Sequence, residues 1–219
     1  MALNISKGNM YEFVTHTWNA IKGECLHGCT YCYMHRWGKQ NQPRLDQKEL
    51  KTDLGHGNFI FTGSSIDMFA GNIPTEWIKK TLAHCCNFDN KYLFQTKNPS
   101  RFLNFKMPKS VFCTTIESDM FYPEIMKQSP KPYERAIYTE IISKIGFETY
   151  VTIEPIMDFN LYKMIELIKK CQPQQVNIGA NTGKIQLPEP PKGKIMELII
   201  ELKKFTTVHE KSNLKRLLK

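Results

Sequence analysis

Segments with strand-like and helix-like composition alternate along nearly the whole chain, and this alternation limits the possible folds more than any other feature. Segments rich in Val, Ile, Phe, Tyr and Thr, which favour strands, lie at residues 12–17, 58–62, 91–95, 110–116, 149–153 and 175–179, and a short one at 206–209 can add a last strand. Between them, apolar residues recur with helical spacing within residues 74–86, 137–145, 161–168 and 195–202. This alternation predicts a parallel sheet covered by helices.

The length of the chain decides which parallel fold is expected. Six strand–helix units are too few for a complete eight-stranded barrel, which typically has about 250 residues. The 219 residues therefore predict an α/β fold with a partial (β/α)6 TIM-like barrel, as a single domain over residues 1–219. Ligands of such sheets bind beyond the carboxyl ends of the strands, so functional side chains are expected in the loops there.

The loop at residues 23–34, after the first predicted strand, carries the most specific motif. Cys25, Cys29 and Cys32 have the spacing C-x3-C-x2-C, and three such thiolates can bind one [4Fe–4S] cluster. Three ligands for four irons leave one iron open, and this iron can chelate the amino and carboxylate groups of S-adenosylmethionine (SAM). The alternative is a zinc site with His27 or His35 as fourth ligand, but the chain has no second C-x2-C pair of the usual zinc type.

The motif, with the aromatic Tyr31 just before its third cysteine, resembles that of the radical SAM superfamily, whose partial barrel fits the predicted alternation. The later motifs are most similar to the spore photoproduct lyase-like group and a related phage-associated family. They are Thr-Trp-Asn-Ala at 17–20, Gly-Ser-Ser-Ile-Asp-Met-Phe at 63–69, Gln-Thr-Lys-Asn-Pro at 95–99, Thr-Thr-Ile-Glu-Ser at 114–118, Ile-Glu-Pro-Ile at 153–156 and Ile-Gly-Ala-Asn at 178–181. The resemblance implies reductive cleavage of SAM to a 5′-deoxyadenosyl radical, which abstracts hydrogen from a nucleic-acid base or nucleotide.

Polar residues at the predicted strand ends form the expected SAM pocket, together with Tyr31. Ser64, Ser65 and the anionic Asp67 follow the second strand and suit the SAM ammonium, although a serine-rich turn that caps a helix would look the same. The resemblance implies that Lys97, after the third strand, pairs with the SAM carboxylate. The alternative for Lys97 is a solvated loop lysine.

The nucleoside part of SAM is expected at the remaining strand ends. The residues placed to bind the ribose hydroxyls follow the fourth strand and are Thr115, Glu117 and Ser118. Glu154 ends the fifth strand and is expected to contact SAM or substrate. Gly179 and Asn181 end the sixth strand, where small residues let backbone approach an adenine ring.

The other cysteines are not part of a second cluster motif. Cys85, Cys86 and Cys171 lie on or at the ends of predicted helices and are expected to be packing residues. Cys113 lies within a predicted strand, so its side chain can face the barrel, where it could donate a hydrogen atom to a product radical.

The charge of the chain bears on its partners. A formal charge of +9 favours a polyanion or a phosphorylated small molecule, although a basic surface alone would explain it. The basic C-terminal element at residues 203–219 carries six Lys or Arg against one Glu, and Lys211 and Lys215 are expected on a rim that contacts nucleic-acid phosphates. Its alternative is an ordinary helix with solvated lysines.

Two further functions stay open from the sequence, namely a radical SAM enzyme for a small metabolite or peptide, and a non-catalytic zinc or Fe–S binding module. A reductive enzyme would also need an electron donor such as flavodoxin or ferredoxin. The sequence has no apolar run of about eighteen residues and no apolar stretch typical of a signal peptide at its start, so we expect a cytoplasmic protein without a membrane partner.

Overall fold

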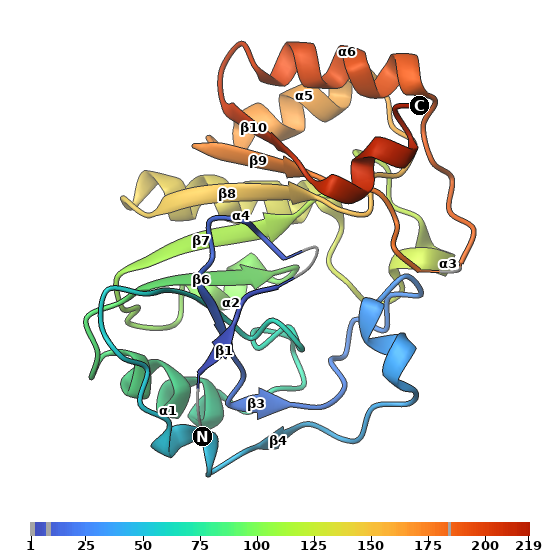
Figure 1. Cartoon of the computed structure of the whole chain (residues 1–219). Coiled ribbons are helices and arrows are strands. Elements are labelled where there is room, and N and C mark those ends of the chain that lie inside the picture. The colour runs from blue at the N-terminus through green and yellow to red at the C-terminus, as the bar shows by residue number, and fades with distance from the viewer. Residues whose placement is uncertain (1–2, 8–9, 184) are drawn as a thin grey trace.

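A computed structural model describes residues 3–7, 10–183 and 185–219 (Figure 1). Its eight-stranded sheet has the order β1-β2-β5-β6-β7-β8-β9-β10. The strands of this sheet are β1 (Asn4–Ile5), β2 (His16–Trp18), β5 (Phe59–Thr62), β6 (Lys91–Thr96), β7 (Ser110–Thr115), β8 (Glu148–Ile153), β9 (Gln175–Ile178) and β10 (Thr207–Glu210). Neighbouring strands from β2 to β10 are parallel, and β1 pairs antiparallel with β2. The two edge strands do not pair with each other, so the sheet is the predicted partial barrel.

Helices connect the parallel strands from β5 onward. They are α1 (Thr75–Cys85), α2 (Pro99–Phe102), α3 (Pro123–Met126), α4 (Pro132–Lys144), α5 (Leu161–Lys170) and α6 (Lys192–Leu202). A proline occupies the first turn of α2, α3 and α4, where its missing N–H is not needed by the helix. No helix among the described residues is long and apolar enough to cross a membrane.

The first connection differs from the predicted alternation. All residues between β2 and β5 are described, and none of them is α-helical. This segment contains the antiparallel strand pair β3 (Ile21–Lys22) and β4 (Arg44–Leu45), and the 3-10 helices η1 (Tyr33–Trp37) and η2 (Glu49–Lys51). The first predicted strand, at residues 12–17, corresponds to β2. It begins later than predicted, at His16, because residues 11–14 form a turn, with the Val14 N–H bonded to the Tyr11 carbonyl at 3.1 Å. This segment instead packs against the concave face of the sheet.

Side chains alternate between the two faces of the sheet, as expected for strands buried on both sides. On the helix side, Ile60, Phe94 and Phe112 join the large core between sheet and helices. On the concave side, Phe61 and Cys113 pack with other apolar residues of the sheet against Tyr11 and Val14. The prediction that the Cys113 side chain faces the barrel interior is therefore confirmed.

The apolar stripe predicted for residues 137–145 is wrong in part. Ile142 is fully buried, but Ile141 and Ile145 are 39% and 58% exposed. The buried face of α4 instead carries Pro132, Arg135, Ala136, Thr139 and Ile142. The buried face of α4 differs from the predicted one because it includes Arg135, which pairs with the buried carboxylate of Glu117. Hydrophobic spacing alone does not reveal this contact. The stripe predicted for α6 is confirmed, because Ile195, Leu198, Ile199 and Leu202 are all buried.

Two of the three cysteines predicted to be packing residues are buried. Cys85 in α1 and Cys171 at the end of α5 have no exposed surface. Cys86 is exposed, so the packing prediction is wrong for this residue, which caps the end of α1 rather than facing the core.

The C-terminal residues add the last strand as predicted. β10 pairs in parallel with β9, and η3 (Ser212–Arg216) follows it. At the junction, the Lys211 N–H bonds to the Ile178 carbonyl at 2.9 Å, so the chain turns inward at the carboxyl end of the sheet. This turn places residues 211–213 beside the loops where the functional residues were expected.

Candidate active site

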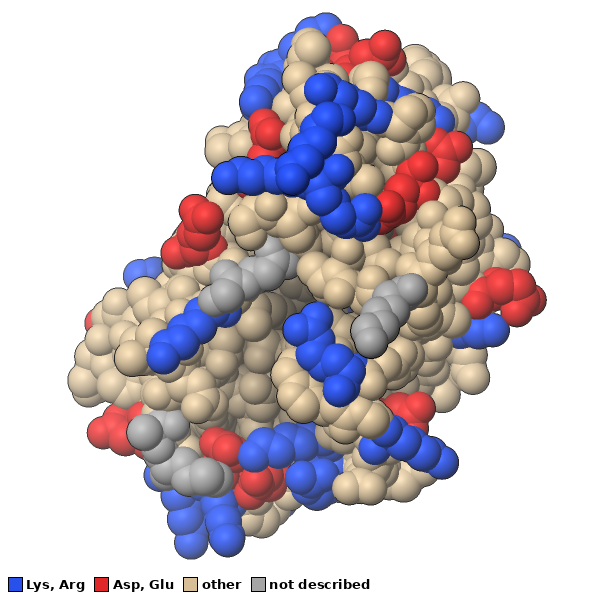
Figure 2. All heavy atoms as spheres, turned by 45° about the vertical axis from the view of Figure 1, so that its right-hand side comes forward, with Lys and Arg blue, Asp and Glu red and all other residues tan. Residues whose placement is uncertain are grey.

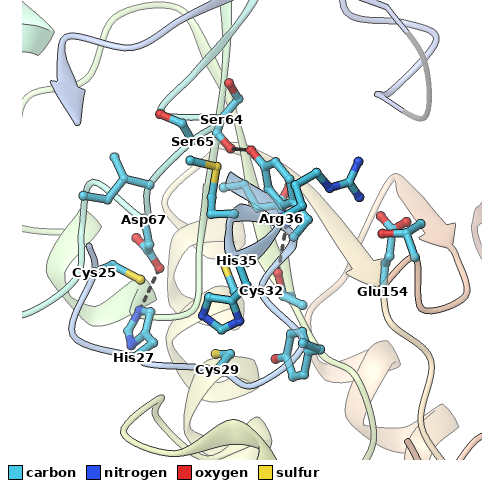
Figure 3. Close-up of a pocket in the computed structure, with 18 of the residues that line it drawn as sticks. Cys25, His27, Cys29, Cys32, His35, Arg36, Ser64, Ser65, Asp67 and Glu154 are labelled. Atoms are coloured by element: carbon cyan, nitrogen blue, oxygen red, sulfur yellow. Dashed lines mark hydrogen bonds and ion pairs between the residues drawn. The ribbon is translucent and has the colours of Figure 1, made fainter. Parts of the chain in front are cut away.

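A pocket of about 1040 Å³ lies at the carboxyl ends of the strands, where the sequence places the functional residues. Figure 3 shows Cys25, Cys29 and Cys32 on one loop, with Ser64 and Ser65 across the pocket and Glu154 on another side. The predicted residues that line it are Cys25, Cys29, Tyr31, Cys32, Ser64, Ser65, Asp67, Lys97, Thr115, Glu154 and Asn181. Glu117, Ser118 and Gly179 do not line it.

Backbone hydrogen bonds tie the cysteine loop to residues 125–128. The Thr30 N–H donates to the Ile125 carbonyl at 3.0 Å, and the Gln128 N–H donates to the His27 carbonyl at 3.1 Å. At the loop's start, Gly23 has φ +117°, and a Cβ there would lie 2.7 Å from the Gln42 carbonyl oxygen. Only glycine fits this combination of conformation and close approach. These contacts hold the loop in its place beside the pocket.

The three thiols of the motif all line the pocket, with Cys29 buried and Cys25 and Cys32 partly buried. Among the described residues, no three His, Cys, Asp or Glu side chains are grouped so that they could hold one metal ion. Burial, followed by the charges of Asp67 and Cys29, raises the pKa of Cys25 to about 12, and burial also raises the pKa of Cys32. Iron cations would favour the thiolate form of these buried groups.

His27 pairs with Asp67 through Nε2, while its Nδ1 is buried and has no hydrogen-bond partner among the described residues, so Nδ1 is the ring nitrogen left for the alternative role as a metal ligand. The His27 Nε2 lies 2.8 Å from Asp67 Oδ2, and the histidine is only 3% exposed. The same carboxylate oxygen accepts hydrogen bonds from the Thr96 hydroxyl at 2.9 Å and the Lys97 N–H at 2.8 Å. The other oxygen accepts the Phe69 N–H at 3.0 Å. These bonds lower the pKa of Asp67 against the effect of its burial, and they tie the cysteine loop to the end of β6.

Glu117 is fully buried beneath the pocket, which corrects its expected contact with the SAM ribose. Its carboxylate pairs with Arg135 Nη1 at 2.7 Å, accepts a hydrogen bond from the Tyr31 hydroxyl, and lies 3.6 Å from Lys97 Nζ. Burial alone would raise the pKa of Glu117, but Arg135 and Lys97 outweigh it and lower the pKa to about 2. Since Lys97 Nζ also lies 5.5 Å from the centre of the Tyr31 ring, this network positions both Tyr31 and Lys97 in the pocket wall.

The three serines predicted to contact SAM differ in where they lie. Ser118 is fully buried and donates to the Asp158 carbonyl at 2.6 Å, which corrects its expected contact with SAM. Ser64 and Ser65 do line the pocket. Asn19 holds them in place, because its Oδ1 accepts the Ser65 N–H at 2.9 Å and its Nδ2 donates to the Ser64 hydroxyl at 3.1 Å. Asn19 belongs to the motif at residues 17–20, whose role the sequence left open.

Glu154 lines the opposite side of the pocket in an ion pair. Lys211 Nζ lies 2.6 Å from Glu154 Oε2, and the Asn213 side-chain amide donates to Oε1 at 2.8 Å. Gly179 leaves room for this pair, because a Cβ there would lie 2.6 Å from Glu154 Oε1. Gly179 therefore accommodates a carboxylate, and since it does not line the pocket, its expected approach to adenine stays a prediction. Lys211 is 6% exposed, so it is not the rim lysine that the sequence predicted, whereas Lys215 is exposed.

Sequence reasoning missed two residues of the site. Tyr11 closes the inner end of the pocket: its hydroxyl bonds to Gln95 and Thr152, and Lys211 Nζ lies 4.6 Å from its ring centre. Its position just before the first predicted strand gave no signal, because a lone Tyr there is equally typical of a surface loop. Arg135 was missed because an arginine within a helix normally faces water.

Comparison with known proteins shows the fold of the chain. Neither family models nor curated protein sequences match it. Among solved structures, a cysteine-to-serine variant of spore photoproduct lyase is similar with a TM-score of 0.65 and 11% identity over 94% of this chain and 79% of that chain. A variant of the same enzyme "with bound AdoMet and dinucleoside spore photoproduct" has a TM-score of 0.56 and 12% identity over 92% of this chain and 66% of that chain. The likeness confirms the partial barrel of the radical SAM type and the resemblance of its fold to spore photoproduct lyase.

Proposed function

We propose that this chain is a radical SAM enzyme that acts on a nucleic-acid base or nucleotide. The observation that carries the proposal is the placement of the three motif cysteines on one fixed loop in a pocket at the carboxyl ends of the strands. The fold is shared with an enzyme whose structure holds AdoMet and a dinucleoside photoproduct, which supports the choice of cofactor and substrate class.

The residues present fit a [4Fe–4S] cluster held by Cys25, Cys29 and Cys32, with one coordination position left for SAM. When bound, this pair would supply one-electron cleavage of SAM and a 5′-deoxyadenosyl radical for hydrogen abstraction. The chain's own contribution is to hold the reactants, because the thiols and Tyr31 lie in the wall of the pocket. An external one-electron donor such as flavodoxin or ferredoxin is part of the proposal.

Lys97 is the residue we propose for the SAM carboxylate. It lines the pocket with a side chain only 17% exposed, and its pKa is raised by Glu117 and Cys29 despite burial, so it stays a cation there. Ser64, Ser65, Thr115 and Asn181 remain proposed SAM contacts from the pocket wall. Asp67 has both oxygens occupied by the protein, so we propose that it positions His27 and Lys97 rather than binding the SAM ammonium.

The size and charge of the pocket support a second ligand beside SAM. A cavity of about 1040 Å³ is at the upper end of the range for small-molecule sites, roughly 300–1,000 Å³. Figure 2 shows Lys and Arg side chains on several sides of a hollow in this face of the molecule. Such a distribution suits a substrate that carries phosphate groups. Glu154 is proposed to contact this substrate or SAM.

The cluster is tested by metal content. Anaerobically reconstituted protein should contain about four irons and labile sulfide per chain, and alanine at Cys25, Cys29 or Cys32 should remove them. The exposed Cys86 provides the matched control, because Cys86→Ser should keep the full iron content. Stoichiometric zinc without sulfide would contradict the proposal and favour the metal-binding module.

The chemistry is tested by products. With dithionite, the loaded protein should convert SAM to methionine and 5′-deoxyadenosine, and Lys97→Met should weaken SAM binding at unchanged iron content. Lys79→Met, on the outer side of α1, is the control and should bind SAM normally. Mass spectrometry of nucleosides, RNA and DNA incubated with the reduced enzyme then identifies the substrate. Turnover of a peptide or metabolite but of no nucleic acid or nucleotide would contradict the substrate class.

A further inference from the structure

An aromatic side chain stands exposed at the pocket directly after the cysteine loop. Trp37, the last residue of η1, is 62% exposed and belongs to the pocket lining. The other two tryptophans, Trp18 and Trp77, pack in or against the hydrophobic core. An exposed indole ring at a pocket is available to stack on a planar ligand such as a nucleic-acid base.

Trp37 is part of an ordered stack. Its ring meets the Tyr33 ring edge-on with centroids 5.8 Å apart, and the Arg36 guanidinium lies 5.3 Å from the Trp37 ring and 5.9 Å from the Tyr33 ring. The Tyr33 hydroxyl donates to the Ser64 carbonyl, which anchors the stack to the loop after β5. In Figure 3, Arg36 points away from Cys25 and Cys29, toward the side of the pocket where Glu154 lies. The stack is therefore fixed at its inner end and open to a ligand at Trp37.

Cations without acidic partners lie along the same opening. Lys7, Arg36 and Lys39 line the pocket, are exposed, and have no ion pair with any acidic residue in the described ranges. The other pocket lysines are different, because Lys211 pairs with Glu154 and Lys97 lies near Glu117. This part of the pocket lining thus combines the positive charges of Lys7, Arg36 and Lys39 with the aromatic face of Trp37. Positive charge and aromatic faces are the two elements that bind single-stranded nucleic acid.

We propose that residues 33–39 form a stacking platform for an unpaired base next to the target nucleotide, so that the substrate is a single-stranded or locally unpaired nucleic-acid strand. This inference rests on the proposed function and goes beyond it by choosing a strand over a free nucleotide. The target base occupies the pocket, its neighbour stacks on Trp37, and Arg36, Lys39 and Lys7 contact the connecting phosphates. A free nucleotide has no second base for the platform, and a fully paired duplex has its bases stacked on each other.

Binding can be measured without turnover, on the cluster-loaded protein under anaerobic conditions. Fluorescence anisotropy of a labelled 12-mer single strand gives the affinity, and the tryptophan emission of the protein reports stacking directly. We expect the single strand to quench the emission, and Trp37→Ala to abolish this quenching and to weaken binding roughly five- to a hundredfold. Tyr162→Ala removes an aromatic residue that is 73% exposed on α5, outside the pocket, and should leave both signals unchanged.

The salt dependence tests the charged part of the platform. Each phosphate contact on a single strand contributes about 0.7 to the slope of log affinity against log salt. Arg36→Gln combined with Lys39→Gln should therefore reduce the slope by about 1.4, while Trp37→Ala lowers the affinity without changing the slope.

The outcomes separate this inference from the proposed function. Quenching that is lost in Trp37→Ala supports the platform. Equal binding of a mononucleotide and the 12-mer, tighter binding of a fully paired duplex, binding without quenching, or no binding of the strand would each overturn it. The proposed function fails on different readouts, namely absence of iron and sulfide or of 5′-deoxyadenosine.

Discussion

Glu117 and Arg135 show how a single buried pair supports the pocket from below. Both side chains have no exposed surface and lie 2.7 Å apart, and Glu117 also holds Tyr31 and Lys97. Removing one partner leaves the other charge buried without compensation. Glu117→Gln should therefore lower the free energy of unfolding by about 3–5 kcal/mol, measured by urea denaturation. Adding Arg135→Met to this variant should restore part of the loss, and a further loss would contradict the pairing.

The pair of Glu117 and Arg135 also predicts how the stability of the protein changes at low pH. The pKa of Glu117 is about 2 in the folded protein against 4.5 ordinarily, so its stabilisation is complete above about pH 4.5 and is lost as the pH falls toward 2. The difference in unfolding free energy between the wild type and Glu117→Gln should shrink over this interval. A difference that stays constant with pH would show that Glu117 is not ionised in the folded state.

Gly179 is a residue where neighbouring side chains leave no room for a Cβ. A Cβ there would lie 2.6 Å from Glu154 Oε1 and 3.0 Å from Asn213 Oδ1, so Gly179→Ala must displace the pair with Lys211. We expect a loss of about 1–3 kcal/mol in thermal or urea unfolding. Gly193→Ala is the matched control, because nothing lies within 4 Å of its Cβ position in α6, and it should be stabilising by up to about 1 kcal/mol. Equal effects of the two substitutions would contradict the crowding at Gly179.

At the residue scale, the sequence predicts which residues reach the pocket better than what each one does there. The cysteine spacing and the strand ends placed Lys97, Asp67 and Glu154 correctly on the pocket wall. The partners of Asp67 and Glu154 could not be predicted, because His27 and Lys211 come from distant parts of the chain and meet them only after folding. Charges that looked available to a ligand are therefore partly used by the protein itself.

At the scale of elements, α4 shows where hydrophobic spacing misleads. Ile141 and Ile145 have the spacing of a buried stripe with Ile142, yet only Ile142 faces the core. Ile142→Ala should cost about 2–5 kcal/mol in unfolding free energy, because it leaves a cavity. Ile141→Lys and Ile145→Lys should each change stability by no more than about 0.5 kcal/mol. Large losses in both lysine variants would mean that the stripe read from the sequence is the buried one.

The strands were predicted better than the connections. Parallel strands buried on both faces are continuous apolar runs, and the sequence located them to within a residue or two from β5 onward. The connection from β2 to β5 has no such period, because its residues are held by the hairpin β3–β4 and by backbone contacts with α3 rather than by one apolar face. The first strand was misplaced for a similar reason, since Tyr11 and Val14 pack on the concave side without being strand residues.

At the scale of the whole molecule, the pocket joins segments from every third of the chain. It is lined by the cysteine loop, by the ends of β5, β6 and β7, and by residues 154–155, 180–182 and 211 near the C-terminus. A ligand that contacts all of these segments holds the two edges of an open sheet together, so it should stabilise the fold as a unit and not only one loop. In the described part of the chain, the edge strands β1 and β10 do not pair with each other, so the sheet itself does not hold its two edges together.

SAM should therefore raise the unfolding temperature of the protein, and the effect should depend on the cluster. Ligand at about 100 times its dissociation constant stabilises by about 2.7 kcal/mol, which for a domain of this size corresponds to a shift of roughly 5–10 °C. Anaerobic scanning calorimetry should show this shift for the loaded wild type and little of it for Cys25→Ala, because that variant lacks the iron that chelates the amino acid part of SAM. Lys97→Met should fall between the two. An equal shift in all three proteins would mean that SAM binds away from the cysteine loop, and the assignment of the pocket would be wrong.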